Sequence, residues 1–292
     1  MEKIEKEILK EVFPKRKENQ YFVKYDFGLL IVIGGSDFYS GSPALNAMAA
    51  FKVGVGMVRI IAPRRAADII SSFSPNLAAY PLEGKWLTKR HLSILIEQTE
   101  AAKQVAYGNV AGVIGGGLGR SRETQETVLE YLKNIDIPFV IDADAIHAIA
   151  KEPKILENKK FLLTPHGYEF FVLTGKKVPL DLPLEEKAKI IKEEAKRLKT
   201  PILFKGKPDI ISDGEKVYLN YTGSPYMAVG GTGDVLAGIC GALMARKVEP
   251  LLAAKAAIFI NGKAGEIAGE KLKESLTATD VIEAIPQVIN EI

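Results

Sequence analysis

Residues 228–245, AVGGTGDVLAGICGALMA, combine a long apolar run with a glycine-rich beginning and a single carboxylate, Asp234. After Asp234 the stretch carries no further charge, which predicts a helix buried on all sides over residues 234–245. The glycines within 230–233 allow backbone N–H groups to wrap around an anion, and the positive end of the helix dipole favours negative charge there. The stretch therefore predicts an anion-binding helix start inside a globular core.

A membrane span is the alternative for this stretch, since its length is near the lower limit for one. Tyr226 and the basic pair at 246–247 could serve as interfacial anchors. Asp234, the glycines of the stretch and the lack of a second such span favour a buried helix instead. We expect no membrane association.

Composition narrows the class of protein. The chain has 292 residues, 47% hydrophobic and 26% charged, as in ordinary globular proteins. Its formal net charge of +3 is too small to favour nucleic-acid binding. The single cysteine, Cys240, excludes an internal disulfide, and the charged N-terminus, MEKIEKEILK, is unlike a signal peptide. We therefore expect a cytoplasmic protein.

Short apolar runs rich in Ile, Val, Leu and Phe alternate with helical patterns along the chain. Because these runs are continuous, they predict strands buried on both faces of a parallel sheet. The predicted strands are residues 29–33, 57–62, 110–114, 139–141, 161–163 and 202–204. Helical patterns begin at Pro43 and cover residues 121–134 and 184–199. We predict an α/β fold, a three-layer helix–sheet–helix domain with a mostly parallel central sheet.

The pattern changes after Lys205. Residues 209–212 and 216–220 flank an Asp-Gly pair, which predicts a hairpin. Further helical patterns cover residues 234–245, 250–269 and 279–289. No linker rich in Pro, Gly or Ser divides the chain, so we predict a single domain over residues 25–292 after a frayed N-terminal extension over residues 1–24.

The carboxyl ends of the predicted strands carry polar segments. In chain order these are GGSDFYSGSP, GGGLGR, DAD, TPHGYE and KGKPD. Ligands of open α/β sheets collect at this edge, and glycines let ligand and backbone approach closely. Asp142 and Asp144, in DAD, are interpreted as helix caps. The other segments predict a ligand site at the edge of the sheet.

Common nucleotide and metal motifs are missing. The run GGGLGR at 115–120 breaks the Rossmann spacing, and no Gly-Lys pair is followed by the Ser or Thr of a phosphate loop. A nucleophile elbow is missing as well. The three histidines, His91, His147 and His166, lie in scattered contexts, which disfavours a histidine-ligated metal.

Asp234 is the candidate catalytic base. A carboxylate in the first helical turn is favoured by the dipole and can be held ionised. From there it could accept a proton from a substrate hydroxyl as that oxygen attacks a terminal phosphate. The alternative is an ordinary N-terminal helix residue, but the glycine run before it and the apolar helix after it favour a catalytic site.

These residues carry a resemblance to a known family. GGTGD at a helix start resembles the anion hole and base of the ribokinase-like superfamily. The segments that narrow the match are YDFG, VIGGSDFYSGSPALNAMAAFKVGVGMV, GGGLGR, VIDADAIHAI, LLTPHGYEF, ILFKGKPDIIS and NYTGSPYMAVGGTGDVLAG. In this order they resemble the ADP/ATP-dependent NAD(P)H-hydrate dehydratases, from about residue 25 to the C-terminus. The resemblance implies a ribokinase-like fold.

The resemblance also implies an activity, which is repair of the (6S)-hydrates of NADH and NADPH (NADHX and NADPHX). The hydrate hydroxyl would be phosphorylated by ADP, giving AMP, or by ATP, and loss of phosphate would restore the double bond. Mg2+ is expected to accompany the nucleotide, held mainly by phosphates and water, with unknown protein ligands. The family also implies a homo-oligomer, a tetramer or larger.

The family's functional residues map onto this chain by its motifs. Asp234 is the implied base and contacts the hydrate. Further implied hydrate contacts are Ser42, Gly119 and His166. The implied nucleotide-binding residues are Lys205, Gly206, Lys207, Pro208, Asp209 and Gly233, and the implied anion hole is Gly231, Thr232 and Gly233.

Some positions depart from the family pattern. Ser42 stands where the family usually has Ala, so its contact with the hydrate is expected through backbone or packing. TPHGYE replaces the commoner TPHPGE, which leaves the local turn open. Ser224 and Tyr226 differ from the usual Asn-Pro-Gly pattern near the nucleotide.

Two other functions stay open at this point. One is a ribokinase-like kinase for a vitamin precursor, such as a thiazole or a hydroxymethylpyrimidine, which would release a stable phosphorylated product. The other is a non-catalytic nucleotide-binding protein, which Asp234 disfavours because a binder needs no base. The choice between ADP and ATP is open, with ADP preferred. The epimerase domain fused to many family members is expected to be absent, since about two dozen residues precede the first motif.

Overall fold

A ten-stranded sheet runs through the part of the protein that the structure describes. The computed structural model describes residues 1–13 and 21–290. The strands are β1 (Glu2–Lys3), β2 (Leu29–Ile33), β3 (Met57–Pro63), β4 (Ala78–Leu82), β5 (Val110–Ile114), β6 (Phe139–Ile141), β7 (Phe161–Leu163), β8 (Ile202–Phe204), β9 (Asp209–Ser212) and β10 (Val217–Asn220). Their order is β1-β10-β9-β8-β7-β6-β5-β2-β3-β4. Strand β9 is antiparallel to β8 and β10, and the remaining pairs are parallel, which confirms the mostly parallel sheet.

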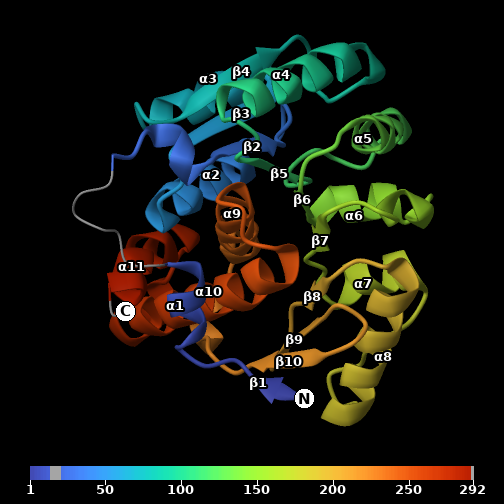
Figure 1. Cartoon of the computed structure of the whole chain (residues 1–292), viewed down its shortest axis with the longest axis vertical. Coiled ribbons are helices and arrows are strands. Elements are labelled where there is room, and N and C mark those ends of the chain that lie inside the picture. Colours follow the sequence, from blue (N-terminus) through green and yellow to red (C-terminus); the bar gives the residue numbers. More distant parts are fainter. Residues whose placement is uncertain (14–20, 291–292) are drawn as a thin grey trace.

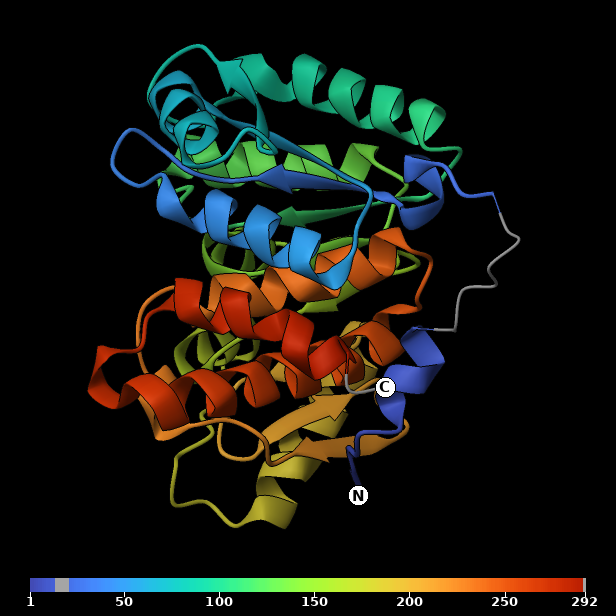
Figure 2. The same ribbon diagram turned by 90° about the vertical axis from the view of Figure 1, so that its left-hand side faces the viewer.

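Helices cover both faces of the sheet. They are α1 (Ile8–Val12), α2 (Gly41–Val53), α3 (Arg64–Phe73), α4 (Leu92–Val105), α5 (Arg122–Asn134), α6 (Ala143–Ile149), α7 (Gly167–Thr174), α8 (Leu184–Leu198), α9 (Thr232–Ala245), α10 (Pro250–Leu272) and α11 (Ala278–Asn290). One hydrophobic cluster joins the sheet to α1, α2, α3, α9, α10 and α11. A second cluster joins its other face to α4, α5, α6, α7 and α8. Figures 1 and 2 show the three layers, with α2, α9, α10 and α11 towards the viewer in Figure 2.

The central strands are apolar at every position because both of their faces are buried. In β2, Leu30 and Val32 belong to the first cluster, whereas Leu29, Ile31 and Ile33 belong to the second. All five side chains are at most 1% exposed. The expectation of strands covered on both faces is therefore confirmed.

Strand β4, which forms the edge of the sheet next to β3, was not predicted from the sequence. Strand β4 is AAYPL, in which the first four residues are exposed or half-buried and Leu82 is buried. A central strand disfavours proline, but an edge strand such as β4 accepts Pro81. Only one face of β4 packs against the protein, and the apolar residues on that face are too few to predict a strand.

The N-terminal residues form part of the fold, so the expectation of a frayed N-terminus is wrong for residues 1–13. Strand β1 pairs in parallel with β10, with Glu2 opposite Tyr218. Ile8, Leu9 and Val12 of α1 are buried in the first cluster. Charged residues between these positions hid the apolar face in the sequence. Residues 14–20 lie outside the described part, and the domain boundary at residue 24 stays a prediction.

Helix α9 lies in the interior of the molecule. It packs on α2, α10 and β5, and its residues from Val235 to Ala245 are buried. Among residues 1–13 and 21–290, no helix is both long and apolar enough to cross a membrane. The apolar character of α9 is explained by burial inside the protein.

Candidate functional site

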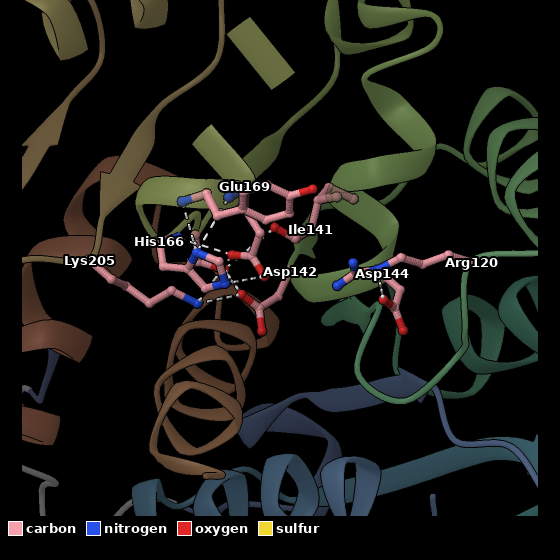
Figure 3. Close-up of polar contacts among 9 residues, drawn as sticks. Arg120, Ile141, Asp142, Asp144, His166, Glu169 and Lys205 are labelled. Atoms are coloured by element: carbon pink, nitrogen blue, oxygen red, sulfur yellow. Dashed lines mark hydrogen bonds and ion pairs between the residues drawn. The ribbon is translucent and has the colours of Figure 1, made fainter. Parts of the chain in front are cut away.

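The carboxyl ends of β2, β5, β6, β7 and β8 lead to loops that converge on the first turn of α9. An isolated parallel bridge between His166 and Lys205 continues the pairing of β7 and β8 into this region. Figure 3 shows His166, Glu169, Asp142 and Lys205 pointing toward one another near α9. A cluster of charged side chains thus lies at the edge of the sheet where a ligand site was predicted.

Asp234 lies in the first turn of α9 and is held by two residues of α2. The Ser42 hydroxyl donates a hydrogen bond to Asp234 Oδ1. The Asn46 amide Nδ2 donates to the backbone oxygen of Asp234 at 2.6 Å. A side chain at Gly116 would collide with Ser42 Oγ and begin 2.8 Å from Asp234 Oδ1, so this glycine lets the β5 loop close over the pair. These contacts fix the carboxylate in position.

The surroundings of Asp234 give its carboxyl group basic character. Burial and the negative charge of Asp142 raise the pKa of Asp234 to about 6, against the hydrogen bond from Ser42 and the positive charge of Lys205. A carboxylate with a pKa near 6 is ionised at neutral pH and accepts a proton more readily than an exposed one. This is the property that a general base requires.

The glycines before Asp234 form the start of α9. Gly231 is the N-cap residue and has a left-handed φ of 97°. The amides that follow it belong to the first helical turn, where backbone N–H groups have no partner within the helix. A side chain at Gly233 would begin 3.4 Å from Lys205 Nζ, so the ammonium group lies against this turn. Backbone amides and an ammonium group together favour an anion here.

Lys205 is half-buried and lies among carboxylates. Its Nζ lies 3.0 Å from Asp142 Oδ1 and 3.8 Å from Glu169 Oε2. Burial lowers the pKa of Lys205, but the charges of Asp142 and Glu169 outweigh burial and raise the pKa above its usual value. Burial also raises the pKa of Glu169. The ammonium group is therefore positive at neutral pH and points along a fixed direction.

The interpretation of Asp142 and Asp144 as helix caps is wrong for their side chains. Asp142 occupies the N-cap position of α6 without a capping bond, and its carboxylate instead accepts from Thr164 Oγ1 at 2.8 Å and pairs with Lys205. The Asp144 carboxylate accepts from the Gly119 amide at 2.9 Å and from Arg120 Nε at 2.7 Å. Both residues organise the loops at the strand ends.

Of the implied hydrate contacts, His166 lies beside the charged cluster. Its Nδ1 accepts from the amides of Tyr168 and Glu169 at the start of α7, so the neutral ring carries its proton on Nε2. Nε2 lies 3.3 Å from Glu169 Oε1, and half of the side chain is exposed. Gly119 belongs to a separate group of contacts with Asp144, which Figure 3 shows beside Arg120. Their contact with the hydrate stays a prediction, as does that of Ser42.

A cavity of about 280 Å³ adjoins the start of α9. The predicted nucleotide residues Lys205, Gly206, Lys207, Pro208, Asp209 and Gly233 all line it, together with Thr232 of the predicted anion hole. Its other walls come from the segment 220–225, Met227, Leu236 and α10. Asp209 accepts from the Gly206 amide and from Asn220 Nδ2, both at 2.9 Å, and burial raises its pKa to about 6. The structure thus brings the predicted nucleotide residues around one space.

Several residues of this region were missed by sequence reasoning. Asn46 lies inside a helical pattern, where a polar side chain gives no positional signal, and Glu169 ends the segment TPHGYE, of which only His166 was given a role. Asn220 and Asn261 face the cavity from β10 and α10. Gly116 was visible only as part of a glycine run. A signal did exist for Asp142, which directly follows a predicted strand.

No group of three or more His, Cys, Asp or Glu side chains suited to a metal occurs within residues 1–13 and 21–290. The two carboxylates nearest to Lys205 are paired with that ammonium group. An all-protein metal cage therefore does not fit the described residues. A cation carried by nucleotide phosphates needs few protein ligands and fits the region better.

Comparison with known proteins identifies the relatives of this chain. The family model described as NAD(P)H-hydrate dehydratase matches residues 30–287. The bifunctional NAD(P)H-hydrate repair enzyme Nnr of Pyrobaculum aerophilum is 41% identical over 279 residues, which cover 95% of this chain and 53% of that protein. The ADP-dependent (S)-NAD(P)H-hydrate dehydratase of Cenarchaeum symbiosum is 34% identical, with 98% of this chain and 95% of that protein covered.

A solved structure agrees with these sequence matches. The ADP/ATP-dependent NAD(P)H-hydrate dehydratase of Bacillus subtilis, co-crystallised with ATP and Mg2+, superposes with a TM-score of 0.83 at 26% identity. The match covers 99% of this chain and 98% of that one. The ribokinase-like fold expected from the sequence is confirmed. The chain spans about half the length of the bifunctional relatives and nearly all of the length of the Cenarchaeum protein.

Proposed function

The chain belongs to the NAD(P)H-hydrate dehydratase family, and from this premise we propose that it converts the (6S)-hydrates of NADH and NADPH back to NADH and NADPH. ADP, giving AMP and phosphate, or ATP supplies the phosphoryl group. The observation that carries the proposal is the placement of Asp234. A partly buried carboxylate with a raised pKa stands at a glycine-lined helix start, next to a cavity lined by the predicted nucleotide residues.

The geometry supports a two-stage reaction. Asp234 accepts the proton of the hydrate hydroxyl while that oxygen attacks the terminal phosphorus of the nucleotide, whose bridging P–O bond breaks. Phosphate then leaves the ring with both electrons of the C–O bond. The neighbouring ring carbon loses a proton, and the electrons of its C–H bond form the double bond. Hydroxide is a poor leaving group and phosphate a good one, so the first stage makes the second possible.

Negative charge that develops during phosphoryl transfer is stabilised from two sides. The amides of Thr232 and Gly233 present partial positive charge at the start of α9, and Lys205 places its ammonium group against the same turn. Such preorganised donors cost no rearrangement at the moment of reaction. Mg2+ bound to the nucleotide phosphates would neutralise further charge, and relatives' structures with ATP and Mg2+ support its presence. In the part of the chain that the structure describes, no group of three or more His, Cys, Asp or Glu side chains would form a protein cage for it.

Kinase activity toward a vitamin precursor is the alternative from the sequence, and the family does not favour it. A kinase of this fold would use the same base and anion hole and would release its phosphorylated product. We propose further that the protein is a cytoplasmic homo-oligomer, a tetramer or larger. ADP is the preferred nucleotide in this proposal, because the Cenarchaeum relative is an ADP-dependent dehydratase.

Hydrate repair is tested by incubating the protein with hydrated NADH, Mg2+ and either ADP or ATP while the NADH absorbance is followed. Wild type is expected to restore the absorbance, and Asp234→Asn is expected to lower the rate by roughly 10²–10⁴-fold, the usual contribution of a positioned base. Recovery with neither nucleotide would contradict the proposal. A stable phosphorylated product without NADH would indicate the kinase.

The stability of the same variant separates a chemical role from a structural one. Since the folded-state pKa of Asp234 is raised to about 6 from 3.8, ionisation of this group destabilises the folded state as pH rises through 6. Asp234→Asn removes that charge, so its unfolding midpoint at pH 8 should be at least as high as that of wild type, with a smaller difference at pH 5. An early unfolding transition at pH 8 would mark Asp234 as a structural cap.

A further inference from the structure

The wall that α10 contributes to the cavity contains an asparagine without a full set of partners. Asn261 is 5% exposed and lines the cavity. Its Oδ1 is buried and has no hydrogen-bond partner. A buried amide oxygen left unpaired destabilises a protein, and such groups are few in native proteins. A residue of this kind in a cavity wall indicates a partner that arrives from outside.

Apolar side chains lie beside Asn261 in the cavity wall. Ile258 lies one turn earlier on α10 and Leu236 lies on α9, and both line the same cavity. Gly262 follows Asn261, and a side chain there would collide with Thr222, so the 220–225 segment lies directly against α10. Asn220 and Thr222 line the same cavity, so apolar walls and a few polar groups surround the space, as is typical of a site that holds a ring and fixes its orientation.

The cavity also has a phosphate-binding region on a different helix. Gly233, Thr232 and Lys205 belong to the start of α9, where the anion hole is expected, whereas Asn261 belongs to α10. A nucleotide with its phosphates at α9 therefore has its sugar and base within the space that α10 borders. The volume of about 280 Å³ is close to the lower end of the range for small-molecule sites.

We propose that Asn261 is a specificity-determining residue that hydrogen-bonds to the nucleobase of the nucleotide and selects adenine by its 6-amino group. An asparagine amide presents one acceptor and two donors side by side, which matches the amino donor and the adjacent ring-nitrogen acceptor of adenine. Oδ1 accepts from the 6-amino group and Nδ2 donates to the ring nitrogen after a small rotation of the side chain. The proposal rests on the proposed function for the identity of the nucleotide.

Calorimetric binding of two nucleotides to two proteins tests this contact. The nucleotides are ADP and purine riboside 5′-diphosphate, which lacks only the 6-amino group, and the proteins are wild type and Asn261→Leu. Wild type is expected to bind ADP about 3–10-fold more tightly than the analogue, and Asn261→Leu is expected to bind both with equal affinity. Loss of affinity for ADP in the variant should be roughly 10-fold.

A matched control uses the other asparagine with an unpaired buried Oδ1. Asn109 lies directly before β5, at the amino ends of the strands, away from the cavity. Its Nδ2 donates to the backbone oxygen of Tyr25, and its Oδ1 has no partner. Asn109→Leu should leave the preference for ADP over the analogue unchanged. Asn261→Leu should melt no earlier than wild type, because it replaces an unpaired amide by an apolar group of similar size.

Three results would overturn the inference: no binding of ADP by wild type, equal binding of both nucleotides by wild type, or an undiminished preference in Asn261→Leu. None of these measurements involves the hydrate. A wild-type protein that prefers ADP in calorimetry and fails to restore NADH would contradict the proposed function and leave the assignment of Asn261 intact.

Discussion

At the scale of the residue, the proposed chemistry of this protein depends on how neighbouring side chains set the pKa of Asp234. Burial and Asp142 raise the pKa of Asp234, while Ser42 and Lys205 lower it, and the result is about 6. The group is therefore ionised over the physiological range but is close enough to neutrality to carry a proton during turnover. The same environment that raises the pKa of Asp234 makes its ionised form costly to the fold.

The rate of repair should depend on pH through this group. Asp234 must be ionised to accept a proton, so kcat/KM should rise with pH and level off above about pH 6. Ser42→Ala removes the hydrogen bond that lowers the pKa of Asp234 and should move the rise to higher pH. The measurement is the pH dependence of kcat/KM for hydrated NADH in both proteins.

Asp209 provides the control for this profile, since burial raises its pKa to about 6 as well. Asp209→Asn keeps an oxygen for the Gly206 amide and removes the titration. The rise near pH 6 should persist in this variant. Its disappearance would assign the profile to nucleotide binding and not to the base.

At the scale of the element, the start of α9 depends on one glycine more than on its neighbour. Gly231 has a φ of 97°, and a side chain there would begin 2.7 Å from Leu45 Cδ1 and 2.9 Å from Ala278 Cβ. Gly230 has no atom within 4 Å of the same position. The first glycine is open to substitution, whereas the second is required by both backbone conformation and packing.

This difference predicts opposite outcomes for two adjacent alanine substitutions. Gly231→Ala should lower the free energy of unfolding by about 2 kcal/mol or more, through backbone strain and overpacking, and should reduce repair by displacing the amides of α9. Gly230→Ala should change stability by less than about 1 kcal/mol and leave repair close to wild type. Denaturant unfolding and the NADH assay measure both. Equal behaviour of the two variants would contradict the assigned geometry.

At the scale of the whole molecule, the N-terminal segment closes one edge of the sheet and covers α10. Strand β1 extends the sheet beyond β10, and α1 packs against α10, which also contributes residues to the cavity at the start of α9. Leu9 is fully buried at this contact. The first residues of the chain therefore belong to the same core as the site.

Leu9→Ala should destabilise the protein by about 2–5 kcal/mol, the range for a buried leucine. The neighbouring Lys10→Ala, at an exposed position, should change the free energy of unfolding by less than about 0.5 kcal/mol. Chemical denaturation of the two variants gives the comparison. A Leu9→Ala variant as stable as Lys10→Ala would show that the N-terminus is frayed after all.

The sequence by itself determined the central architecture, because local patterns carry it. Strands such as Leu29–Ile33 are apolar at every position, which happens where both faces of a sheet are covered, and the predicted bounds of β2, β5, β6, β7, β8 and β9 match the structure. It also indicated that Asp234 lies at a helix start and that a polar loop follows β8, since a glycine run before an apolar helix and a polar strand end are local signals. The edge strands β1 and β4 lacked such signals because much of their surface is exposed.

Only the tertiary structure decided which distant residues act together. Two contacts join segments far apart in the chain, the pairing of Lys205 with Asp142 and the hydrogen bond from Ser42 to Asp234. The unpaired amide of Asn261 likewise became visible only once the cavity wall was known. The pKa of Asp234 likewise comes from burial and from charges on other loops. Electrostatic and packing interactions depend on distance in space, and a one-dimensional pattern carries no information on that distance.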